Sequence, residues 1–497
     1  MTFRLNPSRF SRFIGAAAAT LVLQTWCLDA AARVELPRMF GNGMVVQRNA
    51  QVNLWGTARA NATVKIIPSW SRQTVRTTAD ANGRWRAVLS TPDADGATEH
   101  TIVLDDGERT ELRNILLGEV WICSGQSNME MPLKGFKGQP VEGATEDLIG
   151  CTDRCLRLFT VKRNSQLHPV DTVSGSWREA TPASVRNFSA TAYYFGRALR
   201  RALDVPVGLV VAAWGGSSCE AWMTAEWLRP FADTRIPLRQ EDIWSPNRCA
   251  TVLYNGMLHP LVGMAMRGVI WYQGEDNVPR HPSYAAMLES MIGGWRAAWA
   301  QGPFPFYYCQ IAPYDYSLIN WGGLSPFLRE QQTLVERRVE NCRMACLMDA
   351  GLRYGIHPRK KRQAGERLAL LALANTYGVK GLPEFAAFSS VEFRGDTAVV
   401  AFDRSKEWIY FEQGQPTPGL YKVAGEDRQF HDADARIERN RLYLHSPRVA
   451  HPVAVRYAFD DWAQGDLMHD GLPVSSFRTD TWDAPQGPTT TSSLHNH

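Results

Sequence analysis

The sequence predicts an α/β protein whose central domain contains a parallel sheet, with a β module on each side of it. Two patterns predict this fold. Between residues 114 and 385, apolar runs of strand length, such as 207–213 and 269–272, alternate with helix-like stretches such as 284–299. On both flanks, short segments alternate polar with apolar residues. Continuous apolar runs are typical of parallel strands buried on both faces, and helices between them cover those faces. The central domain is therefore expected to be a three-layer α/β/α domain.

Length and composition support a folded, multidomain chain. The 497 residues are 44% hydrophobic and 21% charged, which is ordinary for globular proteins and excludes a disordered chain. The 54 Lys and Arg residues against 50 Asp and Glu give a net charge of +4. This balance argues against a nucleic-acid partner, because such proteins carry concentrated positive charge.

The first 32 residues predict a secretory signal peptide. Three arginines between positions 4 and 12 precede an apolar run over residues 14–23, and three alanines occupy positions 30–32. The run is too short to cross a bilayer, which needs about 20 apolar residues. We therefore expect cleavage near Ala32 and an exported protein, periplasmic or extracellular, without a membrane anchor. No later segment is long and apolar enough to span a membrane.

Short alternating strands define the two flanking modules. Residues 33–113 form the first and are expected to resemble a β-sandwich, with strands such as 51–55 and 83–88 separated by turn residues. Residues 386–484 form the second, with strands such as 441–445. The Thr- and Ser-rich segment 485–497 predicts a disordered tail.

Cysteine spacing predicts neither a defined disulfide framework nor a metal site. Eight cysteines remain after cleavage, and their pairing cannot be read from spacing alone. The two close pairs, Cys151 with Cys155 and Cys342 with Cys346, have no histidine at zinc-ligand spacing. We expect most cysteines to be small buried hydrophobic residues, with room for one or two bridges.

Polar motifs directly follow the predicted buried strands of the central domain. The carboxyl ends of parallel strands share one edge of a sheet, where ligands of open α/β sheets bind. Together the motifs supply a hydroxyl, backbone amides, a side-chain amide and an imidazole, which are the groups that serine acyl transfer needs. The motifs are residues 124–129, 214–217, 273–277, and Asp349 followed by residues 355–358.

Ser127 is the candidate nucleophile and His357 the candidate base. A serine hydroxyl scarcely ionises near neutral pH, so it needs a base within hydrogen-bond reach. Pro358 suits the first position of a helix, which predicts His357 at the N-cap. The positive end of the helix dipole there would keep the imidazole neutral and able to accept a proton.

Two further motifs are candidates for stabilising a tetrahedral oxyanion. Gly215 and Gly216 allow close backbone approach, so their amides can face the oxygen, although a plain turn also explains them. The amide of Gln273 can donate to the same oxygen, or belong to a buried network. Glu275 is expected to hold its own loop and is a weaker candidate for orienting another group.

The string from Gly118 to Glu130 (GEVWICSGQSNME) resembles the nucleophile block of the sialate O-acetylesterase family, within the SGNH hydrolase superfamily. Segments 214–222, 268–277 and 356–371 resemble its other blocks, and further matches at 44–48 and 452–480 extend the resemblance over nearly the whole mature chain. The resemblance implies an SGNH-type domain over residues 114–385 and hydrolysis of O-acetyl esters on sugars or sialic acids. It implies neither a metal nor an organic cofactor.

The resemblance also implies roles for individual residues. Ser127 would be the nucleophile and His357 the base. The amides of Ser127, Gly215 and Gly216, with the side chain of Gln273, would form the oxyanion hole. One position departs from the family, which usually carries Asp two residues before the histidine, where this chain has Gly355.

Three readings of this departure stay open. A main-chain carbonyl near Gly355 could hold the histidine and leave a Ser–His dyad. A carboxylate from another loop could substitute, and the candidates are Asp349, Asp276 and Glu275. The third reading is a catalytically impaired protein, since losing the acidic member of a triad costs about 10⁴-fold in kcat.

Other enzyme classes fit the sequence less well. The chain lacks the G-x-S-x-G of α/β-hydrolases and the H-E-x-x-H of zinc enzymes. A non-catalytic carbohydrate-binding protein fits the two β modules, but it does not explain why each polar motif follows a separate buried strand. Among esterases, acetylated xylan or pectin is an alternative substrate. Arg353 and Arg359 flank His357 and could bind a sialate carboxylate, or could simply be solvated charges.

Overall fold

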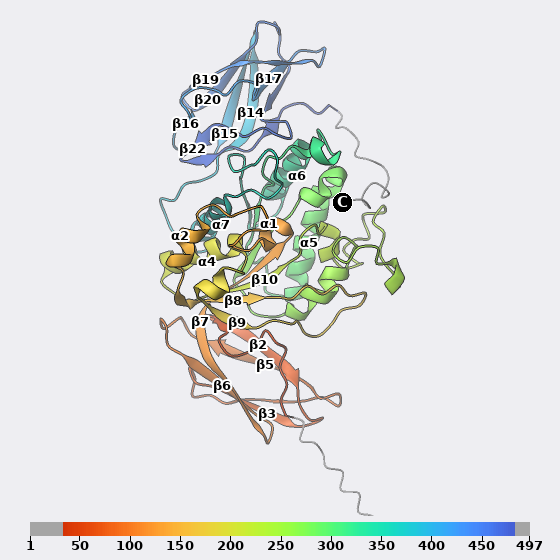
Figure 1. Ribbon diagram of the computed structural model, residues 1–497, viewed down its shortest axis with the longest axis vertical. Coiled ribbons are helices and arrows are strands. Elements are labelled where there is room, and N and C mark those ends of the chain that lie inside the picture. The colour runs from red at the N-terminus through yellow and green to blue at the C-terminus, as the bar shows by residue number, and fades with distance from the viewer. Residues whose placement is uncertain (1–32, 483–497) are drawn as a thin grey trace, which may run out of the picture.

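The computed structural model describes residues 33–482 as three consecutive modules (Figure 1). An N-terminal β module lies at the bottom of the view, a central α/β domain in the middle, and a second β module at the top. The predicted signal peptide at 1–32 and the predicted tail at 485–497 lie outside the described residues. No helix within residues 33–482 combines the length and the apolar character needed to cross a bilayer.

The N-terminal module is built from the alternating strands that the sequence predicts. In β5, every second residue from Trp85 to Thr91 is buried, as expected when one face of a strand packs on a core. β5 pairs with β2, while β3 pairs with β4 and β6, and β6 pairs with β7. These strands are β1 (Val45–Gln47), β2 (Ala50–Thr57), β3 (Thr63–Pro68), β4 (Val75–Thr78), β5 (Arg84–Thr91), β6 (His100–Asp105) and β7 (Arg109–Gly125).

A single strand, β7, joins this module to the central domain. Its first half pairs antiparallel with β6, and its second half pairs in parallel with strands of the central sheet. From Ile115 to Gly125 every residue of β7 is buried. The domain boundary expected at residue 113 therefore falls inside one continuous strand.

The central sheet has the strand order β13-β12-β11-β7-β10-β8-β9. All neighbours are parallel except β9, which is antiparallel to β8 at the edge. The predicted strand at 207–213 is confirmed, and β11 begins one residue before its predicted start, whereas β8 and β9 were not predicted. The remaining strands are β8 (Asp153–Thr160), β9 (Trp177–Ala180), β10 (Val207–Ala213), β11 (Gly268–Tyr272), β12 (Phe306–Cys309) and β13 (Cys342–Ala345).

Helices cover both faces of this sheet. Alternate residues of a strand point to opposite faces, so Trp121 and Ile270 pack with α4 and α7, while Ile122 and Trp271 pack with α5 and α6. The predicted helix at 284–299 is confirmed as α5. The helices are α1 (Ser127–Glu130), α2 (Ala144–Ile149), α3 (Pro182–Val185), α4 (Ala190–Leu203), α5 (Tyr284–Trp299), α6 (Ser325–Arg338) and α7 (Lys361–Asn375).

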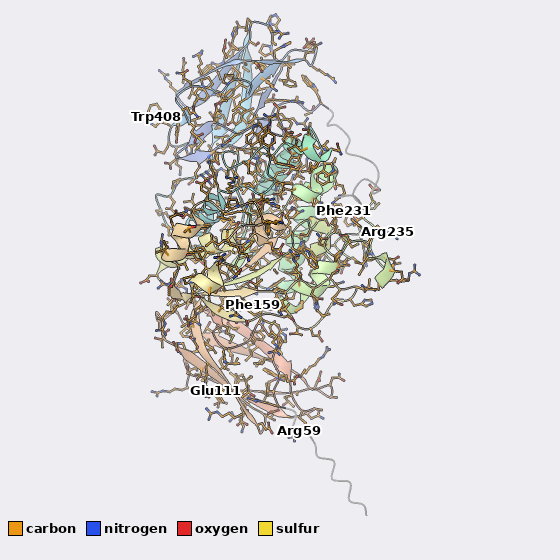
Figure 2. All side chains as sticks on the ribbon, viewed as in Figure 1. Arg59, Glu111, Phe159, Phe231, Arg235 and Trp408 are labelled. Carbon is orange, nitrogen blue, oxygen red and sulfur yellow. The ribbon has the colours of Figure 1, made fainter. Side chains whose placement is uncertain are left out.

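The C-terminal module consists of short antiparallel strands, as the sequence predicts. Its sheets have the orders β14-β15-β20-β19, β18-β17-β21-β24 and β16-β22-β23. Figure 2 shows Trp408 at the outer edge of this module. In the same view, Phe159 of β8 lies next to the N-terminal module. The strands are β14 (Ala387–Arg394), β15 (Thr397–Asp403), β16 (Ile409–Phe411), β17 (Tyr421–Ala424), β18 (Phe430–Asp432), β19 (Asp434–Glu438), β20 (Arg441–His445), β21 (Ala454–Tyr457), β22 (Leu467–His469), β23 (Leu472–Pro473) and β24 (Phe477–Arg478).

The cysteines behave as buried apolar residues. All eight that the structure describes are free and buried, so neither Cys151 with Cys155 nor Cys342 with Cys346 forms a bridge. Burial raises the pKa of the thiols of Cys123 and Cys219 well above its ordinary value, which keeps them protonated and unreactive.

Candidate active site

Ser127 lies at the point where β7 ends and α1 begins. The preceding Gly125 has a φ of 138°, and a Cβ there would lie 2.2 Å from the carbonyl oxygen of Tyr272. Only glycine can therefore let the chain turn so close to β11. Ser127 keeps 9% of its surface exposed. The sharp turn at the end of β7 thus presents the Ser127 hydroxyl at the carboxyl edge of the sheet.

A hydrogen bond ties the serine segment to the histidine segment. The side-chain amide of Asn128 donates to the main-chain oxygen of Ile356 over 3.1 Å. Asn128 follows Ser127 directly, and Ile356 directly precedes His357. Two segments more than two hundred residues apart in sequence therefore lie side by side. This is expected of segments that follow parallel strands of one sheet.

A loop after α1 holds the ring of His357. Nδ1 of His357 lies 2.6 Å from Oε1 of Gln139, and the ring of Phe136 meets the imidazole edge-on with centroids 5.2 Å apart. Phe136 and Gln139 exchange two backbone hydrogen bonds across a tight turn. Gly135 makes this turn possible, because its φ is 79° and a Cβ there would lie 2.2 Å from the Gln139 carbonyl oxygen.

His357 is held in its neutral form. Burial, with a smaller contribution from the charge of Lys361, lowers the pKa of His357 to about 4. The predicted effect of a helix dipole on the imidazole is wrong. The helix α7 begins at Lys361 and not at Pro358, so His357 is not an N-cap. The neutral imidazole results from burial and a neighbouring cation instead of a helix end.

None of the predicted carboxylates orients His357. Asp349 forms two 2.6 Å hydrogen bonds with Arg367, and Asp276 pairs with Arg248 at 2.8 Å. Each carboxylate already has a cationic partner, which explains why it is not directed at the imidazole.

The other two predicted orienters are also placed elsewhere. Glu275 accepts a hydrogen bond from Asn128 at 2.5 Å. Gly355 donates its amide to Leu352, and the partner of His357 Nδ1 is the side chain of Gln139, not a main-chain carbonyl near Gly355. The group that binds Nδ1 of His357, which the sequence did not identify, is therefore the side chain of Gln139.

The two glycines expected in the oxyanion hole differ in their hydrogen bonds. A Cβ on Gly215 would lie 3.3 Å from Cβ of Ser127, so this glycine packs directly against the candidate nucleophile. Its amide, however, donates to Oε2 of Glu130 over 2.7 Å. Among the described residues no acceptor binds the amides of Gly216 or Ser127. These two amides are the ones available to an oxyanion.

Gln273 belongs to a buried hydrogen-bond network that uses both N–H groups of its side chain. Its side-chain nitrogen donates to the Ser217 carbonyl at 3.1 Å and to Oδ1 of Asn277 at 2.6 Å. Its side-chain oxygen accepts from the hydroxyl of Tyr284 at 2.9 Å. Both N–H groups thus have acceptors inside the network, which favours the buried network that the sequence left open, and the oxyanion role of Gln273 stays a prediction.

Arg163 and the predicted Arg353 are each paired with a carboxylate. Arg163 binds Glu130 through two 2.7 Å hydrogen bonds and lies over the ring of Trp214. The predicted Arg353 is exposed and pairs with Asp315 at 3.4 Å, and Arg359 is also exposed. Sequence reasoning missed the pair of Arg163 and Glu130, because Arg163 lies in a segment with no periodic pattern.

Metal-ligating side chains do not cluster in the part of the chain that the structure describes. Within residues 33–482, no three His, Cys, Asp or Glu side chains come together in an arrangement that could hold an ion.

Comparison with known proteins identifies the family of this chain. Residues 117–353 match the model of the family described as carbohydrate esterase, sialic acid-specific acetylesterase. The sialate O-acetylesterases of Rattus norvegicus and Homo sapiens are each 30% identical to this chain, and the matches cover 69% of this chain and 73% and 71% of those proteins. A crystal structure of a carbohydrate acetylesterase from Xanthomonas citri is 34% identical, with a TM-score of 0.82, and the match covers 90% of this chain and all of that one. The chain belongs to the sialate O-acetylesterase family of carboxylic ester hydrolases.

Proposed function

We propose that this chain is an exported serine esterase, built on an SGNH-type α/β/α domain, that removes O-acetyl groups from sugars. The observation that carries the proposal is the hydrogen bond from Asn128 to Ile356, since it brings the Ser127 and His357 segments together. Gln139 then decides which ring nitrogen is basic. With Nδ1–H donated to Oε1 of Gln139, Nε2 is left free to accept a proton.

The reaction follows from these positions. His357 Nε2 takes the proton of the Ser127 hydroxyl as Oγ attacks the acetyl carbonyl carbon. The tetrahedral oxyanion is stabilised by the amides of Ser127 and Gly216. The imidazolium returns the proton to the sugar oxygen, which leaves as an alcohol. Water then attacks the acetyl-enzyme with His357 again as the base, releasing acetate and restoring Ser127.

The family name makes O-acetylated sialic acid the first substrate to test. A second candidate is an uncharged acetylated sugar, such as an acetylated xylan or pectin fragment. The pairing of the nearby arginines favours this candidate, because Arg163 is bound by Glu130 and Arg248 by Asp276. A sialate carboxylate would have to compete with these carboxylates for a guanidinium group.

Acetate release from purified protein tests the proposal. The wild-type protein is expected to hydrolyse p-nitrophenyl acetate, and Ser127→Ala to abolish this activity. Wild-type activity in Ser127→Ala would show that the nucleophile is wrongly assigned. Parallel assays with O-acetyl sialic acid and an acetylated xylo-oligosaccharide separate the two substrates. Saturable binding of both without free acetate would favour a carbohydrate-binding protein.

A further inference from the structure

A buried polar cluster lies directly behind the nucleophile and the base. Asn128, which is fully buried, uses its side chain to contact three separate segments. Its Oδ1 accepts from Nζ of Lys361 at 2.5 Å, and its Nδ2 donates to Oε1 of Glu275 at 2.5 Å and to the carbonyl of Ile356. One amide thus joins the nucleophile turn, the loop after β11, the histidine loop and the first residue of α7.

Lys361 is an unusual residue for the interior of a protein. It is 1% exposed, and Asn128 is its hydrogen-bond partner, while the ring of Tyr272 lies 5.7 Å from Nζ. The titratable groups that face Lys361 are Glu275, Cys309 and His357. Burial lowers the pKa of Lys361, and the charge of Glu275 opposes this change. A lysine is rarely buried without a direct carboxylate contact, which suggests a function for its charge.

Glu275 completes the cluster from the other side of the amide. Its Oε2 is buried and has no hydrogen-bond partner among the described residues, and the same is true of the hydroxyls of Tyr272 and Tyr316. Burial raises the pKa of Glu275, while Asn128 and Lys361 act in the opposite direction. The Asn128 amide and the Lys361 charge are therefore the groups that offset the cost of burying the Glu275 carboxyl group.

We propose that Asn128, Lys361 and Glu275 form a positioning unit that fixes the serine segment against the histidine segment, with the Lys361 ammonium adding to burial in keeping the His357 imidazole neutral. The inference rests on the proposed esterase function, because it assigns His357 as the base. The unit itself touches neither substrate nor the reacting atoms. It acts through the two segments that it joins and through the electric field at the imidazole.

The first test follows the imidazole without requiring turnover. The His357 ring is titrated by proton NMR, with its resonance assigned by its loss in His357→Gln. Lys361→Met is expected to raise the pKa of His357 by about one unit or more. Burial raises the pKa of Glu275 to about 7, so its carboxyl group is already neutral where His357 titrates, and Glu275→Gln is expected to leave the titration close to that of wild type. The double variant is expected to shift it no further than Lys361→Met alone.

Lys360→Met is the matched control, because Lys360 neighbours Lys361 but donates to the carbonyl of Asp349. It is expected to leave the titration unchanged. An unchanged titration in Lys361→Met, or equal shifts in Lys361→Met and Lys360→Met, would overturn the proposal. If the wild-type protein lacked esterase activity while the imidazole still responded as expected, the electrostatic inference would stand and the proposed function would fail.

Kinetics test the positioning part. Asn128→Ala is expected to lower kcat about 100-fold with KM changed less than threefold, because misplacing the reacting groups affects the chemical step. Its melting temperature is measured alongside, and Lys361→Met serves as a second variant because replacing a buried charge by an apolar side chain is often tolerated. Lys361→Met is expected to lower kcat about tenfold. Wild-type kcat in both folded variants would overturn the positioning role.

Discussion

Oε1 of Gln139 lies 2.6 Å from Nδ1 of His357, which is the ring nitrogen that the aspartate of a Ser–His–Asp triad binds. A neutral amide oxygen can fix the ring tautomer and its orientation, as a carboxylate does. It stabilises the imidazolium of the transition state less, because it carries no net charge. In the proposed mechanism the site is therefore a serine–histidine pair supported by an amide, with His357 less basic than in a Ser–His–Asp triad.

Substitution at Gln139 tests this arrangement. Gln139→Leu removes the acceptor and is expected to lower kcat about 100-fold, with little change in KM, because the ring is no longer held with Nε2 free. Gln139→Glu places a carboxylate at Nδ1, so it is expected to raise both kcat and the pKa of His357. Steady-state kinetics on p-nitrophenyl acetate measure both effects. Full activity in a folded Gln139→Leu would mean that another group orients the imidazole.

The low pKa of His357 predicts activity in acid. The base must be neutral in the free enzyme, and its pKa is lowered from 6.5 to about 4, first by burial and then by Lys361. The acidic limb of the kcat/KM profile is therefore expected near pH 4 instead of near pH 6.5. Circular dichroism over the same range distinguishes protonation of the base from acid unfolding. A limb near 6.5 with the fold intact would contradict the burial of the imidazole.

The fold was predictable because its strands and helices carry strong periodic signals. A short, continuous apolar run such as that of β10 is typical of a strand covered on both faces. β8 was missed because Arg157 interrupts its apolar run. In the structure this arginine is 1% exposed, and it is compensated by hydrogen bonds to the Gly43 carbonyl and to Asn114. A buried cation with such distant partners cannot be recognised from local sequence.

The site was predictable only as far as the rule for strand ends applies. That rule predicted that the segments of Ser127, Gly216 and His357 meet at one edge of the sheet, and the structure has these segments side by side. Their catalytic roles stay predictions. The rule could not identify Gln139, which comes from a loop between α1 and α2, because the contact depends on the tight turn that begins at Gly135. The choice of Asp349 failed for a similar reason, since its partner Arg367 lies on α7 and only the folded helix brings the two together.

Gln273 provides a test that separates structure from catalysis. In Gln273→Leu the hydroxyl of Tyr284 and the side chain of Asn277 lose buried partners, so the free energy of unfolding is expected to fall by about 3 kcal/mol. The kcat of the folded protein is expected to stay within about threefold of wild type, whereas losing an oxyanion donor costs about 100-fold or more. Denaturation and kinetics on the same sample measure both. A 100-fold fall in kcat with normal stability would place Gln273 in the oxyanion hole.

Glu130 is the residue whose charge should decide between anionic and neutral substrates. Its carboxylate accepts from the amide of Gly215 and binds Arg163, so it neutralises a guanidinium beside the nucleophile. Glu130→Gln keeps an oxygen for the Gly215 amide but removes the negative charge. Arg163 would then be free to attract the carboxylate of an O-acetyl sialic acid.

Glu130→Gln is expected to change the substrate preference of the esterase and not to abolish its activity. In Glu130→Gln, the ratio of kcat/KM for O-acetyl sialic acid to that for an acetylated xylo-oligosaccharide is expected to rise about tenfold. Stability should change by less than about 1 kcal/mol, because Arg163 is half exposed and exposed ion pairs contribute little. The double variant Glu130→Gln/Arg163→Met should return the ratio to its wild-type value, since the cation that attracts the carboxylate is gone. A ratio that stays constant in Glu130→Gln would place Arg163 outside the reach of the substrate.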